Sequence, residues 1–197
     1  MRWFLLSATE VSDMTELTSD RLQTAAAAYR ERQPFYRVEA DRLETLPKAF
    51  AEGSYLWKDV EWVVRWYARR PLTGEHREPE AAFRENDMGA VERAIDACLA
   101  AEGATDKLNA LLALAGVDVP IGTAFLQYMD PERYLVMGQP EWQVLREAGR
   151  LRYPWPDTVT PADYEAFLVT CQELASEHDL SLLAVGRALW QCGDRPV

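Results

Sequence analysis

The stretch from Leu108 to Gly149 constrains the fold most, because apolar, turn-forming and capping residues alternate there at helical spacing. Apolar side chains three and four residues apart form one face of a first helix: Leu108, Leu111, Leu112 and Ala115. Thr105 is placed to cap this helix and Gly116 to end it. Asp118 is a suitable N-cap for a second helix with Pro120 in its first turn. The sequence therefore predicts two antiparallel helices joined by a short turn.

The second helix is predicted to pack closely against the first, because small residues occupy positions 122–124. Its apolar face continues through Phe125 and Tyr128. Val117 stands in the turn and is expected to point inward, and Gly116 is expected to have a positive φ. We define residues 105–130 as the hairpin unit.

Helical spacing and capping signals recur along the rest of the chain, and roughly nine helices are predicted. Outside the hairpin unit, the predicted helices cover about 18–33, 39–52, 55–67, 87–103, 140–149, 160–175 and 179–191. The second of these is expected to kink or break at Pro47. The helix at 55–67 is apolar nearly all round, so it is expected to be the central buried helix. Between 69 and 87 the residues are charged or turn-forming, which predicts a long loop.

The predicted fold class is therefore all-α. The only candidate strand, residues 134–137, is too short to indicate a sheet. Residues 1–197 are predicted to form a single two-lobed helical domain, in which residues 1–38 are an N-terminal extension.

The hairpin unit resembles a known family. Residues 111–126 read LLALAGVDVPIGTAFL and look like the hairpin of the helix-hairpin-helix DNA glycosylase superfamily. Residues 130–136, followed by Trp142, are similar to that superfamily's run into its catalytic Asp. A branch of small glycosylase-like proteins also carries segments similar to 66–70 and 188–190. The resemblance covers about 46–190 and implies a DNA glycosylase-like fold and base excision repair.

Three departures from the family pattern argue against its chemistry. Asp118 stands where a second glycine lets the backbone approach a DNA phosphate, and an anion there should repel phosphate. Pro120 stands where bifunctional members carry a nucleophilic Lys, so lyase chemistry by that route is excluded. Gly138 stands where the family has its catalytic Asp. Glu141 is then the candidate catalytic carboxylate, with Asp130 and Asp118 also nearby, although Glu141 also fits an acid that complements the helix dipole in a first turn.

Nucleic acid, if it is bound at the family's surface, would contact the hairpin turn, the residue before the third helix and an Arg-rich segment. The candidate residues are Gly116, Val117, Asp118, Gly138, Arg69 and Arg70. The Arg-rich segment also contains Arg65, Arg77 and Arg84, but Glu residues are interleaved with them, so a solvated loop with internal ion pairs is the alternative. Trp62 and Trp66 share a helix face and fit either core packing or base stacking.

The net charge of -11 opposes nonspecific attraction to nucleic acid. The chain has 18 Arg and 3 Lys against 32 acidic residues, which indicates either a GC-rich genome or a cytoplasm of molar salt. In molar salt the Debye length is about 3 Å, so an acidic, halophilic surface would cost little. In that case the net charge indicates the salt concentration in which the protein works, and not the kind of partner that it binds.

No cofactor or metal site is predicted. The three cysteines, Cys98, Cys171 and Cys192, are widely spaced in helical patterns and are expected to be buried apolar residues. His76 and His178 have no second His nearby in sequence. Apolar runs are too short to span a membrane and the start does not read as a secretory signal, so a cytoplasmic protein without a membrane partner is expected.

Three functions are consistent with these residues. The first is a non-catalytic or degenerate DNA glycosylase-like protein that binds nucleic acid through the hairpin. The second is a divergent monofunctional DNA glycosylase that uses another carboxylate. The third is a partner-binding scaffold unrelated to DNA, because a fold does not determine a function.

Overall fold

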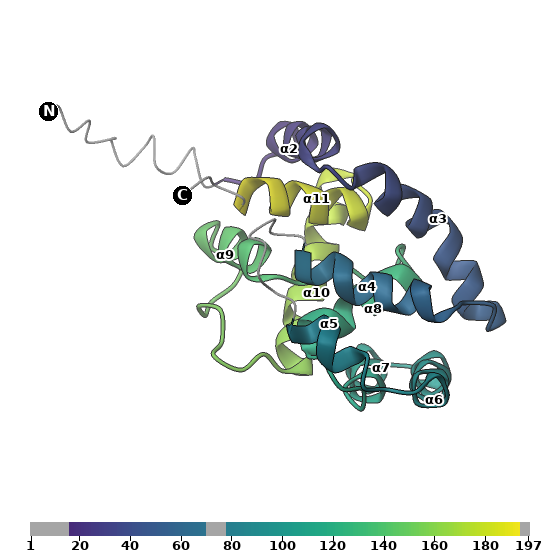
Figure 1. The fold of residues 1–197 in the computed structure, drawn as a ribbon. Helices are drawn as coiled ribbons and strands as arrows, with labels where there is room; N and C mark the ends of the chain where they lie inside the picture. Colours follow the sequence, from purple (N-terminus) through teal and green to yellow (C-terminus); the bar gives the residue numbers. More distant parts are fainter. Residues whose placement is uncertain (1–15, 70–77, 194–197) are drawn as a thin grey trace, which may run out of the picture.

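The computed structural model describes residues 16–69 and 78–193 (Figure 1). This part of the chain contains ten helices and no strand. The helices are α2 (Ser19–Arg32), α3 (Tyr36–Glu52), α4 (Trp57–Arg69), α5 (Glu78–Phe83), α6 (Met88–Ala100), α7 (Ala104–Leu111), α8 (Val119–Met129), α9 (Gln139–Glu147), α10 (Pro161–His178) and α11 (Leu182–Gly193). The all-α prediction is confirmed. Among the described residues, no helix has both the length and the apolar character needed to cross a membrane.

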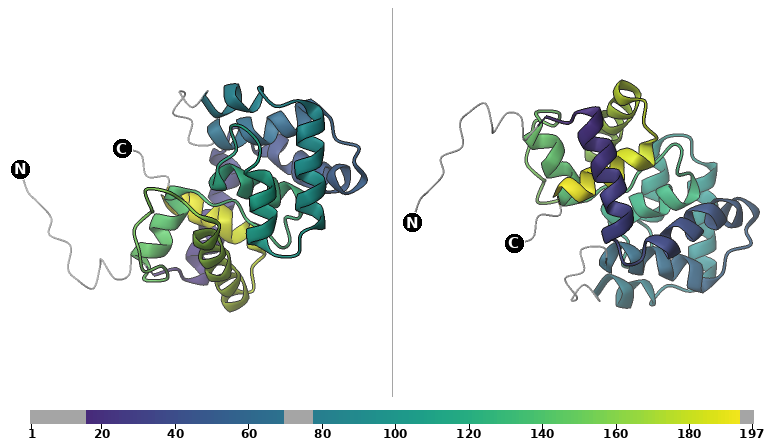
Figure 2. Two further views of the ribbon diagram at one scale, coloured as in Figure 1. Left: turned by 90° about the horizontal axis from the view of Figure 1, so that it is seen from below. Right: turned by 90° about the horizontal axis from the view of Figure 1, so that it is seen from above.

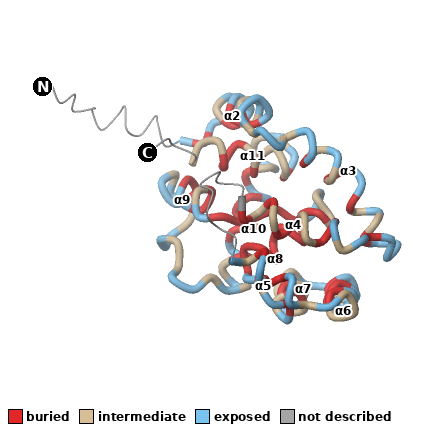
Figure 3. The backbone as a smooth tube through the Cα atoms, in the orientation of Figure 1, coloured by how far each residue is buried: buried red, intermediate tan, exposed pale blue. Residues whose placement is uncertain are grey.

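The helices lie in two groups (Figure 2). Helices α3 to α8 form one group, and α2, α9, α10 and α11 form the other. Buried apolar residues of both groups join in one hydrophobic cluster. Burial is concentrated where the two groups meet (Figure 3).

The centre of this core is α8, and the prediction that residues 55–67 would form the central helix is wrong. Every residue of α8 from Val119 to Tyr128 is buried. Helix α4 instead keeps a face toward solvent, on which Lys58 is exposed and Glu61 and Arg65 form an ion pair. A helix with charged side chains on one face is more stable at the edge of the core than at its centre.

Most predicted helix ends are confirmed by their capping contacts. The side chains of Thr18, Asp87 and Asp118 accept hydrogen bonds from backbone N–H groups of α2, α6 and α8. Thr160 and Asp163 form a reciprocal capping box at the start of α10. These bonds need only residues three positions apart, so the local sequence is enough to predict them.

Other ends differ from the predictions because tertiary contacts compete with local signals. The Thr105 hydroxyl does not cap α7 but donates to Glu165 of α10 at 2.7 Å. Helix α7 ends at Leu111 rather than near Gly116, and hydrogen bonds to carbonyls three residues earlier continue the chain. Asp179 does not begin α11 but ends α10 in the left-handed conformation, with φ 51°.

Helix α3 also departs from its prediction. It runs unbroken through Pro47 and begins at Tyr36, three residues before the predicted start. Tyr36 packs edge-on against Tyr29 of α2, with ring centroids 6.4 Å apart, and the Arg187 guanidinium of α11 lies 4.9 Å from its ring centre. These contacts come from distant parts of the chain and stabilise the extra turn.

The predicted long loop contains a helix, α5. Its Phe83 is fully buried and packs against Trp57 and Phe125, with ring centroids 5.4 and 6.2 Å away. Six residues are too few to show helical periodicity. The position of Phe83 in the core, rather than the spacing of apolar residues, therefore accounts for this helix.

The first described helix, α2, packs across α11, and Leu22 and Tyr29 of α2 are buried beneath it. Buried polar contacts join the same elements. The Tyr29 hydroxyl donates to Glu39 at 2.6 Å, and Arg187 of α11 pairs with the other oxygen of Glu39 at 2.9 Å. The segment predicted as an extension therefore shares the core through α2.

Candidate functional site

The hairpin unit has the geometry predicted for its turn. Gly116 has φ 73°, Val117 is buried, and α7 packs against α8. A Cβ at Gly122 would lie 2.8 Å from a Leu108 methyl carbon, so glycine permits the close approach of the two helices. These observations confirm the predictions for Gly116 and Val117.

One side of the turn packs against α5. A Cβ at Gly116 would lie 2.5 Å from the Pro79 carbonyl oxygen and 2.6 Å from the Phe83 nitrogen. Just after α5, the Asn86 side chain binds both backbone groups of Ala115, accepting from its N–H at 3.0 Å and donating to its carbonyl at 3.0 Å. The backbone on this side of the turn therefore packs against the protein itself.

Asp118 completes the turn as the N-cap of α8. Its carboxylate accepts from the Ile121 N–H at 2.9 Å, and its own carbonyl accepts from the Gly122 N–H at 2.8 Å. Burial raises the pKa of the Asp118 carboxyl, although backbone hydrogen bonds oppose the shift. The Ile121 and Gly122 N–H groups are thus already bonded, and the Asp118 carboxylate stands beside them.

The other part of the candidate site is the segment of residues 134–137, which leads to Gly138. Residues 134–137 are extended and buried without forming a strand. The Val136 N–H donates to the Gln127 side chain, and the Met137 N–H donates to the Thr123 hydroxyl, each at 2.9 Å. The segment therefore runs antiparallel to α8 and brings Gly138 toward the first turn of that helix.

Thr123 connects Pro120 with the backbone next to Gly138, although these two positions are far apart in the sequence. It accepts from the Met137 N–H, next to Gly138, and its hydroxyl donates to the Pro120 carbonyl at 2.6 Å. Thr123 and Gln127 are not among the site residues predicted from the sequence. The sequence does show that these two polar residues lie one turn apart in an otherwise apolar helix. Polar side chains buried in this way need hydrogen-bond partners inside the protein.

Glu141 lies in the first turn of α9, as predicted, but it is fully buried. One of its carboxylate oxygens lies 2.7 Å from the position that a Cβ of Gly138 would take. Burial raises the pKa of the Cys171 thiol, and the Glu141 carboxylate raises it further, which places Glu141 near α10. The carboxylate therefore occupies space that a side chain at position 138 would fill.

The three candidate carboxylates do not form one site. Asp118 and Asp130 cap opposite ends of the eleven-residue α8, and a rise of 1.5 Å per residue separates them by about 18 Å. Asp130 accepts from the Arg133 N–H at 3.2 Å and lies near the Arg133 guanidinium. Glu141 is inside the protein, whereas the other two lie at its surface.

The described part of the Arg-rich segment pairs internally. Arg65 contacts Glu61 at 3.2 Å and Glu80 at 3.3 Å, and Arg84 contacts the same two acids at 2.5 and 3.9 Å. For Arg65 and Arg84, the structure therefore shows the predicted alternative, in which the Arg residues pair with neighbouring Glu residues. The predicted contact Arg70 lies outside the described residues, as do Arg77 and His76, and Arg69 is described only as the end of α4.

The Trp62 and Trp66 pair belongs to the core. Their rings stack with centroids 6.3 Å apart, and both meet Tyr128 of α8 edge-on at 5.1 and 5.2 Å. Trp66 and Tyr128 are buried. These aromatics hold α4 against α8 and do not present a stacking surface.

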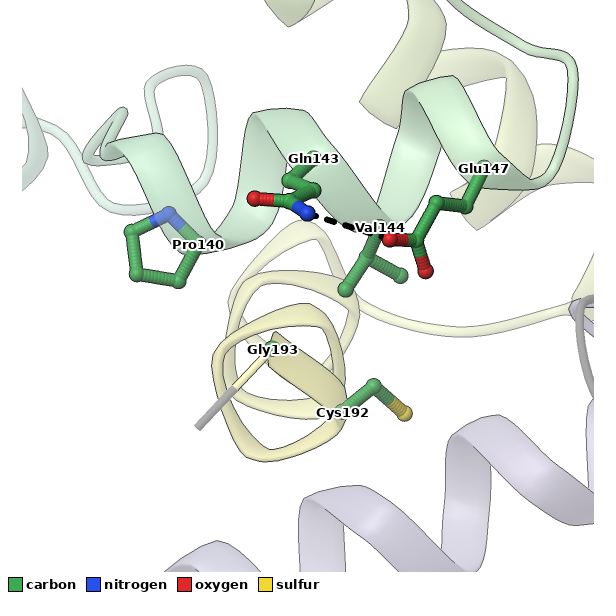
Figure 4. A pocket seen from close by; sticks show the side chains of 6 residues that line it. All are labelled: Pro140, Gln143, Val144, Glu147, Cys192 and Gly193. Atoms are coloured by element: carbon green, nitrogen blue, oxygen red, sulfur yellow. Dashed lines mark hydrogen bonds between the residues drawn. The ribbon is translucent and has the colours of Figure 1, made fainter. Parts of the chain in front are cut away.

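A small cavity of about 160 Å³ lies between α9 and the end of α11 (Figure 4). Gln143 donates to Glu147 at 3.1 Å along one wall, and Cys192 lines another. Cys98 and Cys171 are buried, and burial raises the pKa of the Cys98 thiol to about 11. Within residues 16–69 and 78–193, no group of three His, Cys, Asp or Glu side chains could hold a metal ion.

No protein-family model, curated protein or solved structure matches the chain. Function is therefore inferred from the arrangement of its own residues.

Proposed function

We propose that this chain is a non-catalytic, glycosylase-like protein that works as a partner-binding scaffold and not through contact of the hairpin turn with DNA. The observation that carries the proposal is the position of α5 over the turn. Gly116, which begins the turn two residues before the position whose backbone approaches a phosphate in the resembling family, packs against the backbone of Pro79 and Phe83. The side of the turn toward α5 is therefore already occupied.

Charge and chemistry support the same proposal. Asp118 places a carboxylate in the turn, and the whole chain carries a net charge of -11. Pro120 has no nucleophile, Gly138 has no carboxylate, and Glu141 is fully buried. A catalytic group must reach its substrate at hydrogen-bond distance, so Glu141 in this conformation is poorly placed for excision.

The test is a panel of duplexes that contain damaged or mismatched bases. We expect no base release and no strand cleavage above background. We expect duplex binding at 0.1 M salt to be no tighter than nonspecific binding, roughly 10⁻⁴ to 10⁻⁶ M. Salt-sensitive binding tighter than about 10⁻⁶ M that perturbs the amide signals of Gly116 to Asp118 would overturn the proposal.

A divergent monofunctional glycosylase is the second candidate, and one observation favours it. The Glu141 carboxylate oxygen lies 2.7 Å from the Cβ position of residue 138, close to where an Asp at that position would hold its own carboxylate. Excision would also require Glu141 to become accessible. Base release by the unmodified protein that disappears in Glu141→Gln would establish this candidate and exclude the first.

A further inference from the structure

An open hollow of about 380 Å³ lies where α5 meets the start of α8. Its volume is at the lower end of the range of about 300–1,000 Å³ typical of small-ligand sites. Glu78 and Asp118 contribute carboxylates, while Pro79, Val117 and Ile121 contribute apolar surface. The hollow thus combines negative charge with an apolar wall.

The charges in this hollow come from two different elements. Glu78 is an exposed residue in the first turn of α5, and Asp118 precedes α8. Asp118 is also exposed, and one oxygen of its carboxylate accepts from the Ile121 N–H. A cation near a carboxylate at a protein surface interacts with it more strongly than it would in bulk water.

An anion is a poor occupant of the same hollow. The N-terminal end of a helix attracts anions through its unpaired N–H groups, but here the Ile121 and Gly122 N–H groups bond to Asp118. The carboxylate itself opposes any further negative charge. The start of α8 therefore suits a cation better than an anion.

We propose that this hollow receives an arginine side chain from a partner protein, with the guanidinium between Glu78 and Asp118 and the methylene stem against Pro79, Val117 and Ile121. This inference rests on the proposed partner-binding function. Arginine fits better than lysine, because its planar guanidinium binds carboxylates through several donors and is more weakly hydrated. The net charge of -11 would attract a basic partner segment.

The test is an amide-shift titration of the full chain with Nα-acetyl-arginine amide, whose blocked ends mimic a residue within a protein. Nα-acetyl-citrulline amide, which has a similar shape but no charge, is the control ligand. We expect saturable shifts at Gly116, Val117 and Ile121 with the arginine compound only. Equal shifts with citrulline would overturn the proposal, as would no shift with either.

Two matched variants locate the site. Asp118→Asn removes the charge and keeps a good N-cap, so the fold should persist. We expect it to weaken binding about tenfold, as for the loss of one charge-assisted hydrogen bond. Asp130→Asn, at the other end of α8, should leave binding unchanged. Binding that Asp118→Asn does not weaken, or that Asp130→Asn weakens equally, would overturn the proposal.

A third ligand, free arginine, distinguishes a partner's side chain from a free amino acid. Tighter binding of free arginine than of the blocked compound would indicate an amino-acid site and overturn the partner assignment. The base-release assay on the unmodified protein is independent of these titrations. Base release with normal arginine binding would contradict the proposed function alone, and absent arginine binding without base release would contradict this inference alone.

Discussion

At the scale of single residues, Gly116 and Gly138 have no side chain, and other atoms of the protein occupy the space that a side chain would take. At Gly116 the space is taken by the backbone of α5, and at Gly138 it is taken by the Glu141 carboxylate. The backbone differs between them. Gly116 has φ 73°, which disfavours other residues, whereas Gly138 has φ -142° and ψ 164°, which any residue adopts.

Gly116→Ala should lower the free energy of unfolding by about 3 kcal/mol or more, because strain from positive φ adds to overpacking against α5. Gly53→Ala is the matched control, since Gly53 has φ 64° but no heavy atom within 4 Å of its Cβ position. It should cost only about 1–2 kcal/mol. Urea denaturation measures both, and equal losses would mean that α5 moves away from the turn at little cost.

Gly138→Ala should destabilise the protein by about 1–3 kcal/mol, because the new methyl group meets the Glu141 carboxylate. In a Glu141→Ala background the same change should stabilise by about 0.4–1 kcal/mol, since alanine restricts the unfolded chain. A double-mutant cycle measured by chemical denaturation gives the coupling. The interpretation fails if Gly138→Ala has the same effect in both backgrounds.

At the scale of elements, α8 organises its neighbours through its few polar side chains. Asp118 begins the helix, while Thr123 and Gln127 bind the backbone of the extended segment that leads to Gly138. Buried N–H groups need such partners, because leaving one unsatisfied costs about 1–3 kcal/mol. One helix therefore positions both the hairpin turn and the start of α9.

The contribution of Asp118, at the start of α8, to the free energy of unfolding should depend on pH. The pKa of Asp118 is raised in the folded protein, so the proton binds more tightly there than in the unfolded chain. The stability that this contributes is present below the unfolded pKa of about 3.9 and is lost as pH rises through the folded pKa. The unfolding free energy of the unmodified protein minus that of Asp118→Asn should therefore fall as pH rises above the unfolded pKa of about 3.9.

Glu177 provides a control of opposite sign. Its hydrogen bonds to Arg150, at 2.8 and 2.6 Å, lower its pKa, so its contribution is present above the unfolded pKa and is lost as pH falls. The corresponding difference for Glu177→Gln should rise with pH over the acid range. Differences of the same sign for both variants would contradict this account.

At the scale of the whole molecule, surface charge and core packing act against each other. The chain carries a net charge of -11, while a continuous apolar cluster and the buried contact of Arg187 with Glu39 hold its two groups of helices together. Self-repulsion of surface charge is long-ranged and screened by salt, whereas the core is not.

The melting temperature should therefore rise as KCl increases from about 0.1 M to above 1 M, the range over which the Debye length falls from about 10 Å to 3 Å. Differential scanning calorimetry measures the change. Sodium chloride should act similarly if screening is the cause. An unchanged melting temperature would leave a GC-rich genome as the better explanation of the excess of Arg over Lys.

Local sequence determined the helical class and most helix ends. The caps at Thr18, Asp87 and Thr160 and the positive φ of Gly116 depend on residues within one turn of the chain, so spacing and side-chain type were sufficient to predict them. The hairpin itself belongs to this category, because its breakers and apolar spacing are adjacent in sequence.

Tertiary structure decided what the hairpin turn faces and where Glu141 lies. The cover of α5 depends on Phe83 entering the core beside Phe125, and the burial of Glu141 depends on the space left by Gly138. The apolar spacing of α4 and α8 alone did not identify which one is central. These outcomes depend on contacts between segments distant in sequence, where packing of the whole core outweighs the preferences of any single turn.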